Sequence, residues 1–225
     1  TSTAFATTWT VDDDGKADFD NIQAAVDAAS SGDEIVVMPG TYTGSGSEVV
    51  DTLGKAITIK ASGTPGETII NGGGARRVVQ CSSGEGSDTI IEGFTITGGS
   101  SDDAGGGILC VNSSPTISGC EISGNTAFFY GGGMYNYNSS PTLTDCTFTD
   151  NSAAYGGGMW NHYGYSNPTL TDTVVCGNSP DQIWGTWIDN GGNIVADECE
   201  VQTFWTVDDD GKADFDNIQA AIDAA

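Results

Sequence analysis

Basic side chains are scarce in this chain. Of its 225 residues only 6 are Lys or Arg and 1 is His, against 31 Asp and Glu, so the formal net charge is −25. A chain this acidic repels phosphate, which excludes a nucleic-acid groove and disfavours anionic membranes, and polyuronates where no cations are present. The charge also predicts a saline environment, because a short Debye length screens the repulsion between acidic modules.

Long apolar runs and a basic leader are missing too. No apolar stretch is long enough to span a bilayer, so we expect no transmembrane segment, and the start at Thr1 lacks a basic n-region. We therefore expect a processed or excised chain that is extracellular or on the cell surface. Glycine, in contrast, is abundant, and 33 glycines argue against long helices.

One long segment occurs twice. Residues 9–29 return at positions 205–225, with Val26 against Ile222 as the only change. Two copies this similar indicate a very recent duplication or one shape needed twice, and we interpret them as successive joints of a tandem array or filament. The chain then divides into one module, residues 1–203, and the start of the next repeat, residues 204–225.

Each copy predicts a short strand, an acidic turn and an amphipathic helix. In the first copy Asp20 is the expected N-cap, with Gln23 completing an Asp-led capping box. The apolar residues of the helix form one stripe, which must pack on a coil end of this chain, on a further module or on a neighbouring molecule. The residues of this predicted assembly joint are Trp9, Phe19, Ile22, Val26, Trp205, Val207, Phe215, Ile218, Ala221 and Ile222.

The acidic turn is also a candidate calcium site at each joint. Its spacing does not match an EF-hand, so a capped and solvated turn is the favoured alternative, and no cofactor is required. The candidate ligands are Asp12, Asp14 and Asp18 in the first copy and Asp208, Asp210 and Asp214 in the second.

The middle of the chain repeats at steps of 26 and 27 residues. Pro115, Pro141 and Pro168 open copies of one motif, and a glycine triplet precedes each of the three, at 105–107, 131–133 and 156–158. Short alternating strands separated by glycine turns at this period predict a parallel β-solenoid with one coil per repeat. The predicted inward columns are Ile90/Ile91, Ile117, Leu143 and Leu170 on one wall, Ile96, Ile122, Phe148 and Val175 on another, and Asn125, Asn151 and Asn178 at a turn.

The six cysteines have no CxxC or other metal-ligand spacing. Their even number favours structural use in an oxidising, extracellular compartment. Cys176 with Cys199 is the preferred disulfide, because it would tie down the irregular stretch 177–198, where the repeat motif fades.

Two further cysteine pairs are less defined. Cys120 and Cys146 fall in one column of the repeat, so they either form a somewhat strained bridge or remain buried free thiols. Cys81 with Cys110, in neighbouring coils, is the pair left by elimination.

Two stretches resemble known families. Residues 14–42 resemble the N-terminal capping segment of right-handed parallel β-helix proteins in the pectate-lyase-like superfamily. Residues 131–134 (GGGM) and 148–151 (FTDN) are similar to the repeats of chlamydial polymorphic membrane proteins. The resemblance implies an all-β fold: a right-handed parallel β-helix with a short N-terminal capping helix and a second cap segment at the C-terminus. It implies no single function, because the superfamily mixes polysaccharide lyases, hydrolases and esterases with adhesins and fibres.

Catalytic residues are not recognisable. Lyase chemistry of the superfamily's kind needs a basic residue, yet Arg76 and Arg77 are adjacent and would point to opposite faces of a strand. His162, the lone histidine, has no partner motif for a nucleophilic triad. We therefore expect that the chain is not an enzyme.

Aromatic residues give a better functional signal. Aligning the glycine triplets places Tyr130 over Tyr155 and Tyr135 over Trp160, with Tyr135 and Trp160 facing outward. Such a ladder could stack on sugar rings, form a lateral protein contact, or only cover a wall of the solenoid. The candidate residues are Tyr130, Tyr135, Tyr137, Tyr155, Trp160 and Tyr163.

The sequence thus predicts an extracellular structural protein. It would be a repeating β-solenoid unit of a tandem array or filament, joined head to tail through the duplicated segment, with other copies of itself as partners. The alternative is a carbohydrate-binding adhesin, or a polysaccharide lyase or hydrolase of the β-helix superfamily, with extracellular polysaccharide as its partner.

Overall fold

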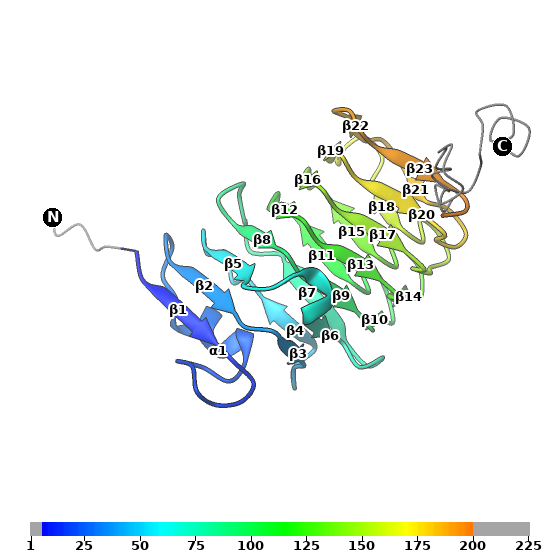
Figure 1. The fold of residues 1–225 in the computed structure, drawn as a ribbon. Helices are drawn as coiled ribbons and strands as arrows, with labels where there is room; N and C mark the ends of the chain where they lie inside the picture. The colour runs from blue at the N-terminus through cyan, green and yellow to red at the C-terminus, as the bar shows by residue number, and fades with distance from the viewer. Residues whose placement is uncertain (1–5, 200–225) are drawn as a thin grey trace, which may run out of the picture.

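The computed structural model describes residues 6–199, which form a right-handed parallel β-solenoid (Figure 1). Successive coils stack along one axis, and each coil adds one strand to each of three parallel sheets. The fold class predicted from the repeat period and the resemblance is therefore confirmed. Within the described range no helix has the length and apolar character needed to cross a membrane.

The first sheet has eight strands and the second has seven. The strands of the first sheet are β1 (Thr8–Val11), β2 (Glu34–Val37), β5 (Thr58–Ala61), β8 (Ile90–Glu92), β12 (Thr116–Ser118), β16 (Thr142–Thr144), β19 (Thr169–Thr171) and β22 (Ile188–Asp189). Those of the second are β3 (Gly40–Tyr42), β6 (Thr68–Asn71), β9 (Thr95–Thr97), β13 (Glu121–Ser123), β17 (Thr147–Thr149), β20 (Val174–Cys176) and β23 (Ile194–Ala196).

The third sheet has six strands and carries the glycine triplets at its entry. Its strands are β4 (Glu48–Asp51), β7 (Arg77–Cys81), β11 (Ile108–Val111), β15 (Met134–Tyr137), β18 (Met159–Asn161) and β21 (Ile183–Trp184). A short extra pair, β10 (Ser100–Ser101) and β14 (Thr126–Ala127), lies at a corner, and a 3₁₀ turn, η1 (Pro65–Glu67), precedes β6.

The apolar core follows from the register of the strands. Ile117 lies opposite Ile91 and Leu143, and Leu143 lies opposite Leu170, so equal positions of adjacent coils stack in one buried column. Parallel neighbours are about 4.8 Å apart, which lets branched side chains pack like on like. Both predicted inward columns are confirmed, except that Ile91 alone points inward while Ile90 lies on the outer face, half-buried.

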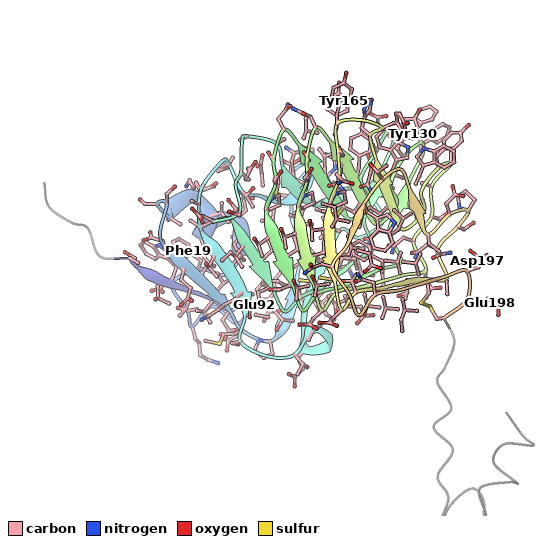
Figure 2. All side chains as sticks on the ribbon, turned by 90° about the horizontal axis from the view of Figure 1, so that it is seen from above. Phe19, Glu92, Tyr130, Tyr165, Asp197 and Glu198 are labelled. Carbon is pink, nitrogen blue, oxygen red and sulfur yellow. A yellow bond between two sulfur atoms is a disulfide. The ribbon has the colours of Figure 1, made fainter. Side chains whose placement is uncertain are left out.

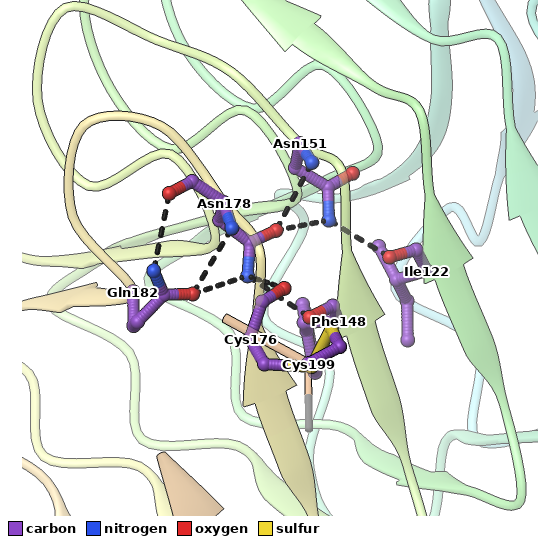
Figure 3. Close-up of a disulfide and its surroundings, with 7 residues drawn as sticks. All are labelled: Ile122, Phe148, Asn151, Cys176, Asn178, Gln182 and Cys199. Atoms are coloured by element: carbon purple, nitrogen blue, oxygen red, sulfur yellow. Dashed lines mark hydrogen bonds between the residues drawn. A yellow bond between two sulfur atoms is a disulfide. The ribbon is translucent and has the colours of Figure 1, made fainter. Parts of the chain in front are cut away.

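The predicted asparagine ladder is present at a corner of the coils (Figure 3). Asn125 Nδ2 donates to Asn151 Oδ1 at 3.0 Å, and Asn151 Nδ2 donates to Asn178 Oδ1 at 2.9 Å. Each amide also donates to a main-chain carbonyl, such as that of Ile122 at 2.8 Å. Gln182 ends the ladder by accepting from Asn178 Nδ2. The ladder thus satisfies the buried backbone groups that the bend leaves unpaired.

The glycine triplets permit close stacking of coils. A Cβ on Gly132 would lie 2.4 Å from the carbonyl oxygen of Ser152 in the next coil, so no larger residue fits there. Gly131, the first of that triplet, has a φ of +61°, which L-residues with side chains rarely adopt.

Among residues 6–199 there is a single α-helix, α1 (Ile22–Ala28), which lies at the N-terminal end of the solenoid. Its N-cap is Asn21, whose side chain accepts a hydrogen bond from the Ala24 amide at 2.8 Å. The predicted Asp20 cap is therefore wrong by one residue, and the predicted capping box is absent, because Gln23 bonds instead to Asp51 on β4. The predicted stripe is confirmed, since Ile22, Ala25 and Val26 are buried.

The cysteines follow the preferred prediction at one pair only. Cys176 and Cys199 form a disulfide, whereas the other four cysteines, Cys81, Cys110, Cys120 and Cys146, are buried free thiols. The bridge predicted between Cys81 and Cys110 is absent, although the two residues lie directly opposite each other. In-register parallel strands keep side chains about 4.8 Å apart, while a disulfide needs its Cβ atoms at about 3.8 Å. Cys120 and Cys146 take the free-thiol alternative.

Candidate functional sites

The first copy of the duplicated segment forms the first rung of the solenoid and its cap. Strand β1 pairs with β2 in register from Thr8 opposite Glu34 to Val11 opposite Val37. Trp9 Nε1 donates to Asp33 Oδ2 at 3.2 Å, and the Trp9 ring meets Phe19 edge-on at 5.5 Å. Both rings are half-buried against the core, so the strand contributes side chains as well as backbone bonds.

Helix α1 covers the N-terminal end of the solenoid's apolar interior and is held there by specific polar contacts. The Gln23 side chain accepts from the Asp51 amide at 2.7 Å and donates to the Asp51 carbonyl at 3.2 Å. Lys55 Nζ donates to the carbonyls of Val26 and Asp27, at 2.6 and 3.0 Å, where the helix ends. A cation at a helix C-terminus compensates both the unpaired carbonyls and the helix dipole. The structure therefore brings together the predicted joint residues of the first copy as an intramolecular cap.

The second copy lies outside the described residues. This applies to the joint residues and the candidate calcium ligands of that copy: Trp205, Val207, Phe215, Ile218, Ala221, Ile222, Asp208, Asp210 and Asp214. The division of the chain at residue 204 likewise stays a prediction.

The last described coil, formed by β21, β22 and β23, leaves apolar side chains exposed at its open end and on its walls. Val195 lies opposite the buried Val175 in an inward column, yet 42% of it is exposed. Ile188 and Ile194 occupy outward-facing positions of their strands and are 45% and 47% exposed, so they add apolar surface on the outer walls of this coil. Figure 2 places Asp197 and Glu198 at this end and Phe19 near the other. The two ends therefore differ, because one carries an amphipathic helix and the other leaves apolar surface uncovered by any described residue.

A carboxylate occupies the end of one core column. Asp189 lies opposite Leu170, in the column that Leu143 and Ile117 fill in earlier coils. It accepts from the Gly191 amide at 2.9 Å and from Asn193 Nδ2 at 2.6 Å, and these bonds, led by the Gly191 amide, hold its pKa below the usual range. A further coil stacked directly on β22 would bury this charge, which disfavours uncapped continuation of the solenoid.

The acidic turn of the first copy is organised by its own hydrogen bonds. Asp18 accepts from the Thr10 amide at 2.9 Å and from the Thr10 hydroxyl at 2.8 Å, and these bonds lower its pKa. Asp14 pairs with Lys16, and Asp12 accepts from the Asp14 amide at 3.3 Å. Among residues 6–199 no cluster of three His, Cys, Asp or Glu side chains is placed to hold a metal ion. The candidate calcium site in this turn stays a prediction.

Aromatic side chains form a continuous strip along the outer face of the third sheet. We call Tyr130, Tyr135, Tyr155, Trp160 and Trp184 the aromatic strip. Tyr135 and Trp160 stack with ring centroids 4.9 Å apart and planes at 4°. Tyr130 lies 4.8 Å from Trp160 and 5.8 Å from Tyr155, and Tyr155 meets Trp184 edge-on at 5.9 Å. The predicted pairs Tyr130 with Tyr155 and Tyr135 with Trp160 are confirmed as neighbours.

Trp184 is the member of the strip that the sequence analysis missed. It lies opposite Trp160 on β21, but its coil has no glycine triplet from which to count. The available signal was the position of the residue, 24 places after Trp160, close to the repeat period.

A looser aromatic group continues from the strip. Tyr137 meets His162 edge-on at 4.8 Å, and His162 lies 5.4 Å from both Trp160 and Tyr165. Tyr163 is 80% exposed. Figure 2 shows Tyr130 and Tyr165 projecting from the same edge of the solenoid. His162 is thus surrounded by aromatic rings.

The two arginines have different environments. Arg77 donates to the carbonyls of Gly105 and Ala104, at 2.9 and 2.8 Å, and to Gln80 Oε1 at 2.8 Å, so it links adjacent coils. Arg76 is half-exposed and lines, with Arg77 and Asp102, a cavity of about 290 Å³. The fixed bonds of Arg77 give it a structural task at this corner.

Comparison with known proteins adds one finding on the family. A family model described as a right handed beta helix region matches residues 42–215. No curated protein matches the chain.

Proposed function

The chain belongs to the right-handed β-helix family, and we propose that it serves as an extracellular structural unit that joins copies of itself head to tail through the duplicated segment. The observation that carries the proposal is the role of residues 9–29, which form a rung and a cap on one end of a solenoid. A second copy of the same sequence follows the last described coil, where apolar residues are exposed.

The apolar stripe supplies the driving force. Ile22 and Val26 are fully buried in the first copy, and burial of such a side chain stabilises by about 1.5–3 kcal/mol. Ile218 and Ile222 occupy the same positions in the second copy, so that segment has the same tendency to cover an apolar surface. The Asp189 carboxylate supports a joint made through such a cap, because it disfavours direct stacking of one bare coil on another.

Two features support a place outside the cell. The Cys176–Cys199 disulfide requires an oxidising compartment to persist, and the net charge of −25 favours solubility at high ionic strength. The proposal includes no catalytic role. Two observations support a structural role for these side chains: Arg77 is bonded to main-chain carbonyls, and His162 lies among aromatic rings.

The proposal is tested by comparing the full chain with a chain lacking residues 204–225. At about 1 M salt, where the Debye length is about 3 Å, the full chain should form rods whose axial repeat is one solenoid, seen by electron microscopy and light scattering. The shortened chain should stay monomeric. Uniform, compact monomers of the full chain, or equal association of both chains, would contradict the proposal.

A second candidate function is binding of uncharged polysaccharide to the aromatic strip. It is favoured by the stacked pair Tyr135 and Trp160 and by their exposed neighbours Tyr155 and Trp184. Flat aromatic faces fit the apolar faces of sugar rings, and an acidic surface disfavours anionic polymers. In affinity electrophoresis, retention by uncharged glucans should disappear in Trp160→Ala and persist in the exposed control Leu53→Ala. Absence of retention across such polymers would remove this candidate.

A further inference from the structure

We propose that residues 205–225 of one molecule occupy, on the next molecule, the site that residues 9–29 occupy in the structure. The inference rests on the proposed head-to-tail function and adds where the second copy binds and what it displaces. The partner is a second copy of this chain, and the joint is an exchange of equivalent segments.

The strand part of the site can accept either copy. Main-chain bonds between β1 and β2 depend on backbone register, which the second copy can reproduce. The Asp33 carboxylate that receives the Trp9 indole N–H would receive that of Trp205. Val11 is completely buried on the first rung, and Val207 carries the same side chain.

The polar contacts to the helix also involve only groups that both copies have. Asp51 bonds through its main chain to Gln23, which corresponds to Gln219. Lys55 binds main-chain carbonyls at the helix end, and these are independent of side-chain identity.

The single difference lies at the centre of the buried stripe. Val26 is completely buried, and Ile222 brings one more methylene to that position. The added group stabilises the exchanged cap if the core accepts it, and costs free energy if it does not. In either case the two segments compete for one site with similar contact energies.

Tethering then decides which segment is bound. Ala29 is joined to β2 through only four residues, which gives the first copy an effective concentration in the millimolar range for short flexible linkers. In dilute solution the molecule therefore keeps its own segment. Exchange becomes favourable at high protein concentration, or when the first copy is weakened and the second is intact.

This competition gives opposite expectations for equivalent substitutions in the two copies. Val26→Asp places a charge in the buried stripe of the first copy only, so it should lower the protein concentration at which the full chain associates by at least about tenfold. Ile222→Asp damages the donor segment and should abolish association. The double variant Val26→Asp/Ile222→Asp is the matched control, since it has the same weakened cap without an intact donor, and it should stay monomeric.

Light scattering across a concentration series at high salt measures these effects, and hydrogen exchange identifies the displaced segment. If the segments exchange as proposed, residues 22–28 should lose amide protection in the associated form of the unaltered chain. If Val26→Asp does not strengthen association while Ile222→Asp abolishes it, the proposed exchange of segments is wrong, and the second copy joins molecules by another contact. If Ile222→Asp leaves association unchanged, the proposed head-to-tail function fails as well. Association of the double variant would identify nonspecific aggregation of an uncapped end and overturn the exchange.

Discussion

The asparagine ladder offers a direct test of how the coils are held together. Asn151 is 1% exposed, and its side chain takes part in four hydrogen bonds. Its Oδ1 accepts from the amide and side-chain nitrogens of Asn125, both at 3.0 Å, and its Nδ2 donates to Ile122 O and Asn178 Oδ1. Asn151→Ala therefore leaves buried polar groups without a partner.

The cost can be worked out from the groups that are stranded. Asn178 Oδ1 keeps a donor in the Asn151 amide, but the Asn125 amide and one hydrogen of the Asn125 Nδ2 group lose their acceptor. Each unsatisfied buried group costs about 1–3 kcal/mol, so the loss of two partners should lower the free energy of unfolding by about 2–6 kcal/mol. This is a large share of the about 5–15 kcal/mol that stabilises a typical domain.

Urea unfolding followed by circular dichroism measures this loss. Asn190→Ala is the matched control, because Asn190 is exposed and its amide donates at 3.1 Å to Thr171 Oγ1 in the neighbouring coil. Loss of that exposed bond should change the free energy of unfolding by less than about 0.5 kcal/mol. Equal effects of the two substitutions, or a loss below about 1 kcal/mol for Asn151→Ala, would show that the buried ladder does not stabilise the stack as reasoned.

Three further predictions concern the thiols, the disulfide and one buried carboxylate. Burial raises the pKa of Cys146 to about 11, and all four free thiols are buried, so alkylation at pH 8 should label none of them in the native protein and four after denaturation without reductant. Labelling of none after denaturation would indicate further bridges. Cys199→Ser opens a loop that spans 23 residues, so it should cost about 3 kcal/mol, read as a lower midpoint in urea; an unchanged midpoint would contradict this. Burial tends to raise the pKa of Glu85, but hydrogen bonds led by that from Ser113 outweigh it, and the net pKa lies below the usual range. A depressed folded-state pKa stabilises above the unfolded value and is lost as pH falls through the folded value, so the gap in Tm between the native chain and Glu85→Gln should narrow on acidification, and a gap independent of pH would refute this.

The sequence predicted the features that repeat and was less accurate where the repeat stops. Stacking places similar residues at equivalent positions of successive coils, so the repeat spacing alone predicted the columns of Ile117, Leu143 and Asn151. Helix α1 was predicted from its apolar stripe, but Asp20 and Asn21 are both suitable caps, and the choice of Asn21 and the bond of Gln23 to Asp51 depend on how the helix packs.

Features without a periodic signal were missed. Trp184 belongs to a coil whose motif has faded, so its place in the aromatic strip depends on a register that the sequence does not reveal. Asp189 was not expected in a core column for the same reason. The free thiols of Cys81 and Cys110 depend on the distance between rungs and not on the number of cysteines.

The position of the disulfide has a mechanical consequence for any larger assembly. Tension applied to the chain beyond Cys199 passes through the sulfur–sulfur bond directly to Cys176 at the end of β20. The intervening loop, which contains all three strands of the terminal coil, carries none of that load. Force from a neighbouring unit would therefore act on β20, which is paired on both sides in its sheet with β17 and β23. The terminal coil would not bear that force.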